Sequence, residues 1–205
     1  MRFLPPFGRF LPLLLIGCLV LSCGDDALPV PKPRSYPRVY YPERDYVRTQ
    51  AEHCDFSFDV PASAEVEQQE LFFDRTPPDS CWFDVVLDDR LNGSVHFSYY
   101  PVDSYATWEN LREEAFELVG VHNDRASNIE EIVIHRDDAD VHGLAFDISG
   151  PTASPFQFFL TDTTNHFVRG ALYFNVVTEP DSLGPVIEYV KEDIFRMVES
   201  FAWER

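Results

Sequence analysis

The sequence predicts a single α+β domain in which an antiparallel sheet is covered by two main helices. Short stretches of alternating apolar and polar residues are typical of strands, and the brief turns between them favour antiparallel pairing. Two longer stretches place apolar residues three or four positions apart, as amphipathic helices do. The 205-residue chain is 45% hydrophobic and 15% aromatic, with 18 phenylalanines, so it can bury a sizeable core.

The first predicted strands precede the first helix. In the earliest one, Phe56, Phe58 and Val60 alternate with polar residues. Pro61 ends this strand, because proline cannot donate a hydrogen bond to the sheet. Three further strands are expected at Leu71–Phe73, Trp82–Asp88 and Ser94–Tyr100.

The last two of these strands are joined through Asn92-Gly93, a pair that favours a type I′ hairpin turn. A strict two-residue loop would, however, place Val95 beside Arg90. We therefore expect either a bulge that shifts the register or a sheet whose two faces are both partly covered.

The first helix is predicted to follow Asp103 or Ser104, either of which can cap it, and to end at Gly120. Its apolar positions are Tyr105, Trp108, Leu111, Ala115, Leu118 and Val119. An acidic link, Asp137–Asp140, and a turn at Asp162–Asn165 then join two pairs of strands. These four strands are expected at Ile129–His135, His142–Ile148, Phe156–Thr161 and His166–Val176.

The last helix is predicted to be capped by Ser182, with Pro185 in its first turn. Its apolar positions are Ile187, Val190, Ile194, Met197, Val198 and Phe201. The resulting order of strands, helix, four strands and helix is similar to that of the PsbP-like sandwich, a curved antiparallel sheet between helices. This resemblance concerns the fold and implies nothing about function.

Residues 1–22 have the features of a signal peptide. Arg2 and Arg9 form a basic region, and Phe10–Leu21 forms an apolar region that is too short for a permanent membrane span. Cys23 follows short aliphatic residues and a serine, which is typical of bacterial lipoproteins. We expect Cys23 to be acylated, with palmitate among its chains, and to become the first residue of the mature chain.

Cys18 ends a second stretch of lipoprotein type, but Leu19–Leu21 would then be exposed directly after the anchor. Polar residues begin right after Cys23, which favours Cys23 as the acylated residue. An ordinary secretory signal with an incidental cysteine is the remaining alternative.

Residues 23–52 are expected to form the lipid anchor and a proline-rich tether, and residues 53–205 the globular domain. The prolines favour extended polyproline geometry. Aromatic and basic residues alternate with them, so the arm can either lie along the domain or contact a partner. The prolines are Pro29, Pro31, Pro33, Pro37 and Pro42.

The formal net charge of −19 repels phosphate backbones and anionic lipid head groups. Nucleic acid is therefore not expected as a partner. Such acidity is typical of a solvated surface, although it would also suit a basic partner.

Cys54 and Cys81 remain once Cys18 and Cys23 are assigned to the leader and the anchor. In an oxidising envelope compartment such a pair usually forms a disulfide, here across a loop of about 26 residues. A metal or redox pair is the alternative, but no CxxC spacing supports it.

The chain lacks GxSxG, P-loop, dinucleotide-binding and HExxH motifs, so we expect neither an enzyme nor a cofactor. His135 and His142 would face each other near Asp137, Asp138 and Asp140, an arrangement that can bind a metal. Acidic hairpin tips are usually solvated turns, however, and we expect no metal there.

Arg169 interrupts an otherwise apolar strand near Asp162. Its guanidinium can contact an anion. Alternatively, it can pair with Asp162 or another carboxylate on an exposed face of the sheet.

The segment from Ala153 to Asn175, ASPFQFFLTDTTNHFVRGALYFN, closely resembles the gliding motility-associated lipoprotein GldD family of Bacteroidetes. Other segments that agree with the family are Lys32–Arg38, Cys54, Cys81–Phe83 and Pro185–Ile194. The resemblance covers nearly all of the mature chain, whereas residues 101–140 match only by pattern.

The resemblance implies a membrane-anchored lipoprotein that faces the periplasm, with the outer membrane favoured over the inner membrane. It implies a non-enzymatic assembly or accessory role in gliding motility and type IX protein secretion. Proteins of these machineries are then the expected partners. The acidic, lysine-poor composition departs from the family and indicates a saline habitat or a lineage that secretes without gliding.

The hairpin from Pro155 to Phe174 is then the expected interaction surface. The alternative is that this segment is only the central hairpin of the sheet. Two other functions are left open, namely a lipoprotein that binds a small apolar ligand in a cleft between sheet and helix, and an envelope hydrolase with an unfamiliar site. The expected polar contacts of the surface are Gln157, Thr161, Asp162, His166 and Arg169.

Overall fold

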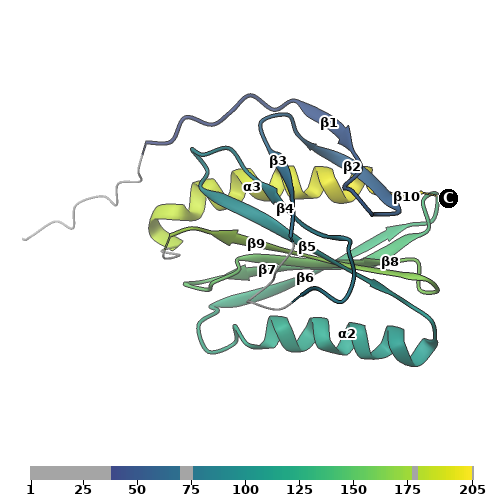
Figure 1. The fold of residues 1–205 in the computed structure, drawn as a ribbon. Helices are drawn as coiled ribbons and strands as arrows, with labels where there is room; N and C mark the ends of the chain where they lie inside the picture. The colour runs from purple at the N-terminus through teal and green to yellow at the C-terminus, as the bar shows by residue number, and fades with distance from the viewer. Residues whose placement is uncertain (1–37, 70–75, 177–179, 205) are drawn as a thin grey trace, which may run out of the picture. The chain divides into compact units, whose positions relative to one another are not determined.

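The computed structural model describes residues 38–69, 76–176 and 180–204. In this part of the chain, a seven-stranded antiparallel sheet forms the central layer. Helix α2 (Tyr105–Gly120) covers one face, and helix α3 (Pro180–Ser200) covers the other together with a small second sheet (Figure 1). The predicted α+β class, an antiparallel sheet covered by two main helices, is confirmed.

The large sheet has the strand order β3-β4-β5-β9-β8-β7-β6. Strands β8 and β9 lie near the middle of this order, so the segment from Pro155 to Phe174 is indeed the central hairpin of the sheet. The strands are β3 (Glu65–Gln68), β4 (Trp82–Val86), β5 (Gly93–Pro101), β6 (Asn128–Arg136), β7 (Val141–Ser149), β8 (Phe156–Thr161) and β9 (His166–Phe174).

The small sheet has the order β1-β2-β10. Its middle strand was predicted, whereas β1 lies within residues assigned above to the tether. Because β1 pairs antiparallel with β2, the ordered domain begins before His53. The strands are β1 (Tyr46–Thr49), β2 (Phe56–Pro61) and β10 (Ala202–Trp203).

The residues before β1 lie along α3. Tyr41 stacks on Tyr189 with ring centroids 4.5 Å apart, and the guanidinium of Arg44 lies 4.3 Å from the centroid of the same ring. At the start of β1 itself, the Tyr46 hydroxyl donates a hydrogen bond of 2.7 Å to Asp193. The arm was expected either to lie along the domain or to contact a partner. This part of the arm lies along the domain.

Four predicted features lie outside the described residues, among them the extended geometry of the tether up to Pro37. The others are the signal peptide of residues 1–22, the two candidate acylation sites Cys18 and Cys23, and the short strand at Leu71–Phe73. These features stay predictions.

Two hydrophobic cores flank the sheet in the described part of the chain. The core beneath α3 and the small sheet is rich in phenylalanine, and the rings of Phe83 and Phe97 stack with centroids 4.8 Å apart. Full burial of one such ring stabilises the fold by about 1.5–3 kcal/mol. The core beneath α2 contains Leu111, Ala115, Val119, Phe146, Ile148, Phe159 and Phe167.

The helix starts differ in how well they were predicted. Helix α2 begins after Ser104, whose hydroxyl accepts a hydrogen bond of 3.2 Å from the backbone N–H of Thr107, as an N-cap does. Helix α3 begins at Pro180, so the predicted cap Ser182 and Pro185 both lie inside it. Proline suits a first helical position, because its missing N–H has no partner to lose there.

The connection between β4 and β5 is longer than a two-residue turn. Val85 pairs with Val95, and the backbone N–H of Leu87 donates to the Gly93 carbonyl at 3.0 Å. Strand β4 thus ends at Val86, before the predicted Asp88. The register differs from that of a strict turn because the connection is longer. Of the two expectations for this hairpin, the second applies, since both faces of the sheet are covered.

Cys54 and Cys81 form the predicted disulfide, with their Cα atoms 5.1 Å apart. Both cysteines are buried. The bond joins the chain just before β2 to the chain just before β4, so it links the small sheet to the large one.

Candidate functional site

The five polar residues predicted on the β8–β9 hairpin fall into two separate places. Thr161, Asp162 and His166 build the turn at its end, whereas Gln157 and Arg169 line a cavity under α2. Thr161, Asp162 and Arg169 are at most 8% exposed. The structure therefore does not gather the five side chains on one exposed surface, because the sheet needs three of them for its own packing.

Asp162 holds the turn together. Its Oδ1 atom accepts hydrogen bonds from the backbone N–H groups of Asn165 at 2.8 Å, His166 at 2.9 Å and Thr164 at 3.0 Å. Burial acts to raise the pKa of this carboxyl, but the three N–H donors outweigh it and hold the pKa below its usual value. These hydrogen bonds within the turn are therefore enough to explain why an aspartate occupies position 162.

His166 connects the same turn to the small sheet. Its ring stacks on Trp203 with centroids 4.9 Å apart, and its Nδ1 atom lies 2.9 Å from the Tyr99 hydroxyl. The backbone carbonyl of His166 accepts a hydrogen bond of 2.7 Å from Thr161. These contacts fix the hairpin end against β10.

Arg169 ties α2 to the sheet. Its Nη2 atom donates to the Glu114 carboxylate at 2.8 Å and to the Leu111 carbonyl at 2.9 Å, and both acceptors belong to α2. The guanidinium carbon also lies 4.9 Å from the centroid of the Tyr100 ring. Arg169 thus pairs with Glu114 and not with Asp162. The face of the sheet on which Arg169 lies is covered by α2 and is not exposed.

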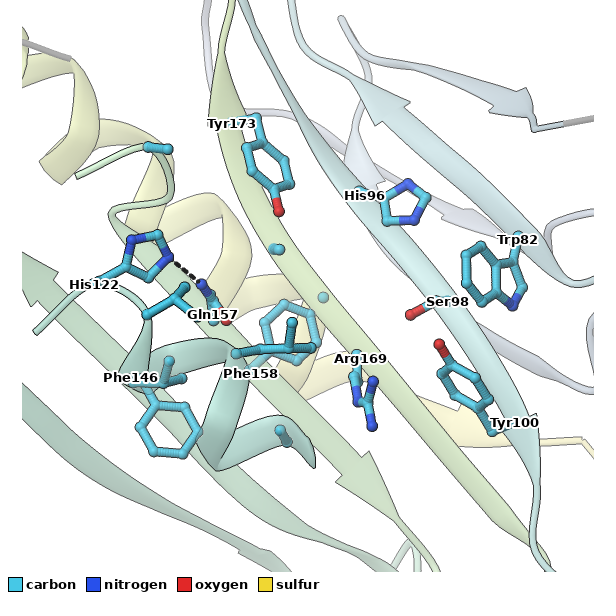
Figure 2. A pocket seen from close by; sticks show the side chains of 17 residues that line it. Trp82, His96, Ser98, Tyr100, His122, Phe146, Gln157, Phe158, Arg169 and Tyr173 are labelled. Carbon is cyan, nitrogen blue, oxygen red and sulfur yellow. Dashed lines mark hydrogen bonds between the residues drawn. The ribbon is translucent and has the colours of Figure 1, made fainter. Parts of the chain in front are cut away.

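A cavity of about 270 Å³ lies between α2 and the large sheet (Figure 2). This is the location that the apolar-ligand alternative requires. Arg169 is the only Asp, Glu, Lys or Arg among the described residues that line it. The strands contribute aromatic rings from Trp82, Tyr100, Phe146, Phe158 and Tyr173.

Hydrogen bonds join several polar groups at the cavity. The Nε2 atoms of Gln157 and His122 are 3.0 Å apart, and burial lowers the pKa of His122, which favours a neutral ring. His96 contacts Asp84 through its Nδ1 atom at 2.6 Å. The Nε atom of Arg169, by contrast, is buried and has no hydrogen-bond partner among the described residues.

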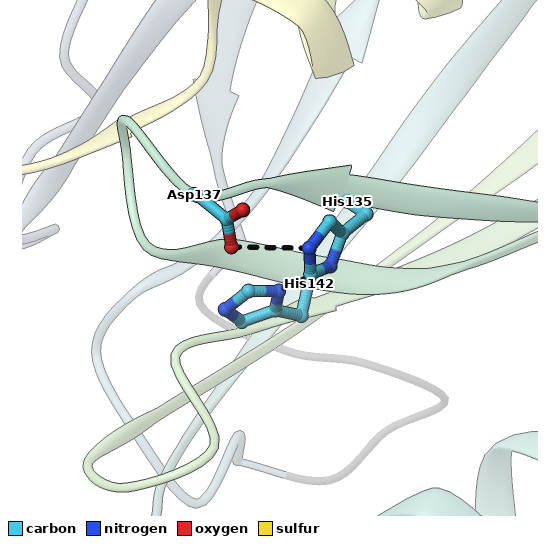
Figure 3. A group of neighbouring side chains, drawn as sticks. All are labelled: His135, Asp137 and His142. Carbon is cyan, nitrogen blue, oxygen red and sulfur yellow. Dashed lines mark hydrogen bonds and ion pairs between the residues drawn. The ribbon is translucent and has the colours of Figure 1, made fainter.

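A second cluster lies at the tip of the β6–β7 hairpin (Figure 3). His135 and His142 face each other as predicted, with their Nδ1 atoms 3.0 Å apart, and Asp137 lies 3.0 Å from Nε2 of His135. One ligand atom from each of the three residues lies within 4.8 Å of the others. Such a donor set can bind a divalent metal, so the expectation that no metal binds here stays a prediction.

Sequence reasoning missed most of the cavity lining. The available signal was the period of two along β9, which puts Arg169, Ala171 and Tyr173 on one face. Ala171 is a small residue between the large residues Arg169 and Tyr173 on the face that packs against α2, so it leaves space there. Without the pairing of β9 with β5, however, Tyr100 and Arg169 could not be placed together.

These observations define the class of the protein as a disulfide-linked module with a helix-covered antiparallel sheet and a cavity beneath one helix. No helix in the described ranges combines the length and the apolar character of a membrane span. A family model for the gliding motility lipoprotein GldD matches residues 26–203, and the chain belongs to this family. Membership confirms the resemblance found in the sequence and associates the chain with gliding motility and with lipoproteins of the cell envelope.

Comparison with solved structures gives a weaker similarity. The solution structure of cyanobacterial PsbP (CyanoP) from Synechocystis sp. PCC 6803 superposes with a TM-score of 0.47 at 8% sequence identity. The match covers 79% of this chain and 94% of that chain. No curated protein matches the chain.

Proposed function

We propose that the chain is a non-enzymatic accessory or assembly component of gliding motility and type IX protein secretion. The observation that carries the proposal is the family match over residues 26–203. The lack of known catalytic motifs in the sequence supports a non-enzymatic role. The Cys54–Cys81 disulfide suits an oxidising compartment outside the cytoplasm.

The same proposal includes a lipid anchor on Cys23, after removal of residues 1–22. Each buried methylene of an acyl chain contributes about 0.8 kcal/mol, so two or more chains hold the protein stably on a membrane. The domain then faces the periplasm, with the outer membrane favoured. The tether ends by Val39, because this residue already packs against the hydrophobic core.

The anchor is tested by replacing each candidate cysteine. In Cys23→Ser cells, we expect the protein to keep its signal peptide and to incorporate no labelled palmitate, because the thiol that is acylated is absent. Cys18→Ser is the matched control and should be processed and labelled like the wild type. Loss of label in the Cys18 variant alone would place the anchor at Cys18 instead.

The role in the envelope is tested by crosslinking in intact cells, followed by capture of a tagged copy that restores the deletion strain. We expect proteins of the gliding and type IX secretion machineries to be enriched with the wild type. Enrichment should fall for Cys23→Ser, because an unanchored chain does not stay beside membrane components. If the functional tagged copy recovers none of these proteins, the proposal fails.

A further inference from the structure

We propose that the tip of the β6–β7 hairpin binds a divalent transition metal, copper more tightly than zinc, through the Nδ1 atoms of His135 and His142 (Figure 3). This inference goes beyond the proposed function, which requires no metal. The sequence pattern favours a solvated turn here. The reason to propose a metal is the position of the protons on the two rings, which follows from contacts that only the structure shows.

Strand pairing brings the two histidines together. His135 lies directly opposite His142 in the ladder between β6 and β7, so both side chains are on the same face of the sheet. Their ring centroids are 4.8 Å apart, and their Nδ1 atoms are 3.0 Å apart. The side chain of His135 is 61% exposed and that of His142 is 26% exposed, so a metal can reach them and keep water on its other positions.

A carboxylate lies on the far side of each ring. Oδ1 of Asp137 is 3.0 Å from Nε2 of His135, and Oδ1 of Asp140 is 3.4 Å from Nε2 of His142. An ionised carboxylate only accepts hydrogen bonds, so each one favours a proton on the Nε2 atom that it faces. A neutral imidazole carries one such proton, and both Nδ1 atoms are then left as acceptors.

Two acceptors that face each other across 3.0 Å repel, and a cation between them removes the repulsion. A histidine that binds a metal through one ring nitrogen usually donates the N–H of the other to a carboxylate. His135 with Asp137, and His142 with Asp140, have this arrangement. The two pairs are thus placed as ligands with their outer hydrogen bonds already present.

The separation of the Nδ1 atoms suits two ligands of one transition metal. With bonds of 2.0–2.1 Å, two ligand nitrogens are roughly 2.9 Å apart at the right angle of a square-planar site and roughly 3.4 Å apart at the tetrahedral angle of zinc. The 3.0 Å found here is closer to the square-planar value, which copper(II) favours. Magnesium and calcium prefer oxygen ligands, so we expect neither to bind.

The charge of the hairpin tip also favours a cation. Asp137, Asp138 and Asp140 lie within four residues of each other. The nearby Arg136 alternates with His135 along β6, so it points to the opposite face of the sheet. There its guanidinium lies 3.6 Å from Asp138 and donates to the backbone carbonyl of Phe201 at 2.7 Å.

The hairpin tip is fixed against the end of the chain. Nε1 of Trp203 in β10 donates a hydrogen bond of 2.9 Å to the backbone carbonyl of Asp140. The bond from Arg136 to Phe201 holds the other strand of the hairpin. Ligands on a backbone that is already ordered lose less conformational entropy when the metal binds.

Metal binding is measured by calorimetry on the full-length acylated protein, without an affinity tag, in phosphatidylcholine nanodiscs at neutral pH. The probes are Cu²⁺, Zn²⁺ and Mg²⁺, and empty nanodiscs are the blank. We expect one Cu²⁺ per chain, Zn²⁺ bound at least about tenfold more weakly, and no binding of Mg²⁺. Pulsed electron paramagnetic resonance should count two imidazole ligands on the copper.

Substitutions test the ligands and their carboxylates. His135→Ala and His142→Ala should each weaken Cu²⁺ binding by about 100-fold or more, whereas His53→Ala, at an exposed histidine, should not. Asp137→Asn should weaken binding by about tenfold, as the loss of an outer carboxylate does. Asp138→Asn is its matched control, because this carboxylate faces Arg136 instead. Since His135 and Asp137 are exposed, these variants should fold.

The inference is overturned by any of three results. No Cu²⁺ binding beyond that of empty nanodiscs would mean that a shared proton, and not a metal, joins the two rings. Full affinity in both His135→Ala and His142→Ala would place the copper elsewhere. Equal losses in Asp137→Asn and Asp138→Asn would mean that only the general negative charge matters, and the assignment of the protons would fail.

Discussion

Buried polar side chains in this protein hold elements together. Arg169 connects β9 to α2 through Glu114, and Lys191, which is 8% exposed, connects α3 to β7 with its Nζ atom 2.6 Å from Asp147. Asp162 closes a turn by accepting hydrogen bonds from three backbone N–H groups and, at 3.4 Å, from the side-chain amide of Asn165. A buried cation that loses its carboxylate partner destabilises the fold, by less where the partner is half exposed, as Glu114 is. Each of these residues therefore contributes to stability whatever the function.

The turn residue Asp162 gives a prediction about pH. Asp162→Asn keeps an acceptor oxygen but removes the charge, and hydrogen bonds to charged groups are roughly twice as strong as neutral ones. We expect the free energy of unfolding near neutral pH to fall by about 1–2 kcal/mol. Asp124→Asn, at an exposed position, is the control and should change it little.

The pH dependence follows from the direction of the shift. The pKa of Asp162 is lower in the folded protein, so its stabilisation is fully present above the unfolded value of about 3.9. This stabilisation is lost as pH falls through the folded pKa. Denaturant titrations at decreasing pH should therefore show the gap between wild type and Asp162→Asn closing in acid, and a gap that widens would contradict the assignment.

At the scale of elements, close contact between β8 and β9 depends on the lack of a side chain at Gly170. Gly170 lies opposite Phe158, and a Cβ atom at this position would lie 2.1 Å from the Phe158 ring. The same residues form the floor of the cavity beside Arg169. The hairpin therefore combines dense packing on the α3 side with open space on the α2 side.

Gly170→Ala is expected to destabilise the fold by at least about 1–3 kcal/mol, because the ring or the strand must move. Gly120→Ala is the matched control, since a Cβ atom there meets only Asn123 at 3.8 Å, an ordinary contact. Thermal unfolding of both variants measures the difference. Similar melting temperatures for the two variants would mean that the hairpin is packed less tightly than described.

How far the sequence predicts the elements depends on how local their causes are. Helix α2 follows from its period and the Ser104 cap, and β5 and β9 follow from alternating residues. Strand β3 is nearly all polar and β10 has two residues, so neither carries a burial pattern. The pairing of Arg169 with Glu114 spans 55 positions, and only the assembled fold brings these two side chains together.

At the scale of the whole molecule, the N-terminal part of the domain is held by the disulfide and by the contacts of the arm with α3. Cys54 and Cys81 were predicted to pair because they are the two cysteines that remain once Cys18 and Cys23 are assigned to the leader and the anchor. A cleft between sheet and helix was predicted only as an alternative. The residues that line the cavity come from several strands, and the order of these strands in the sheet cannot be deduced from local sequence patterns. The network of Arg44, Tyr46 and Asp193 was likewise outside the reach of local patterns.

The disulfide gives a prediction about overall stability. The bond spans a sequence separation of 27 residues. Loop-closure entropy then predicts that the Cys54→Ala/Cys81→Ala double variant loses about 3.5 kcal/mol of unfolding free energy. Chemical denaturation should show this loss, reduction of the wild type should reproduce it, and an unchanged midpoint would mean that the bond constrains nothing.

The central claim is that this chain acts in gliding and type IX secretion while anchored by its lipid. The most direct measurement scores colony spreading and the amount of secreted type IX cargo in a deletion strain. The strain is complemented with the wild type, Cys18→Ser or Cys23→Ser. We predict that deletion abolishes both activities, that the wild type and Cys18→Ser restore them, and that Cys23→Ser does not. A deletion strain that spreads and secretes like its parent would contradict the account.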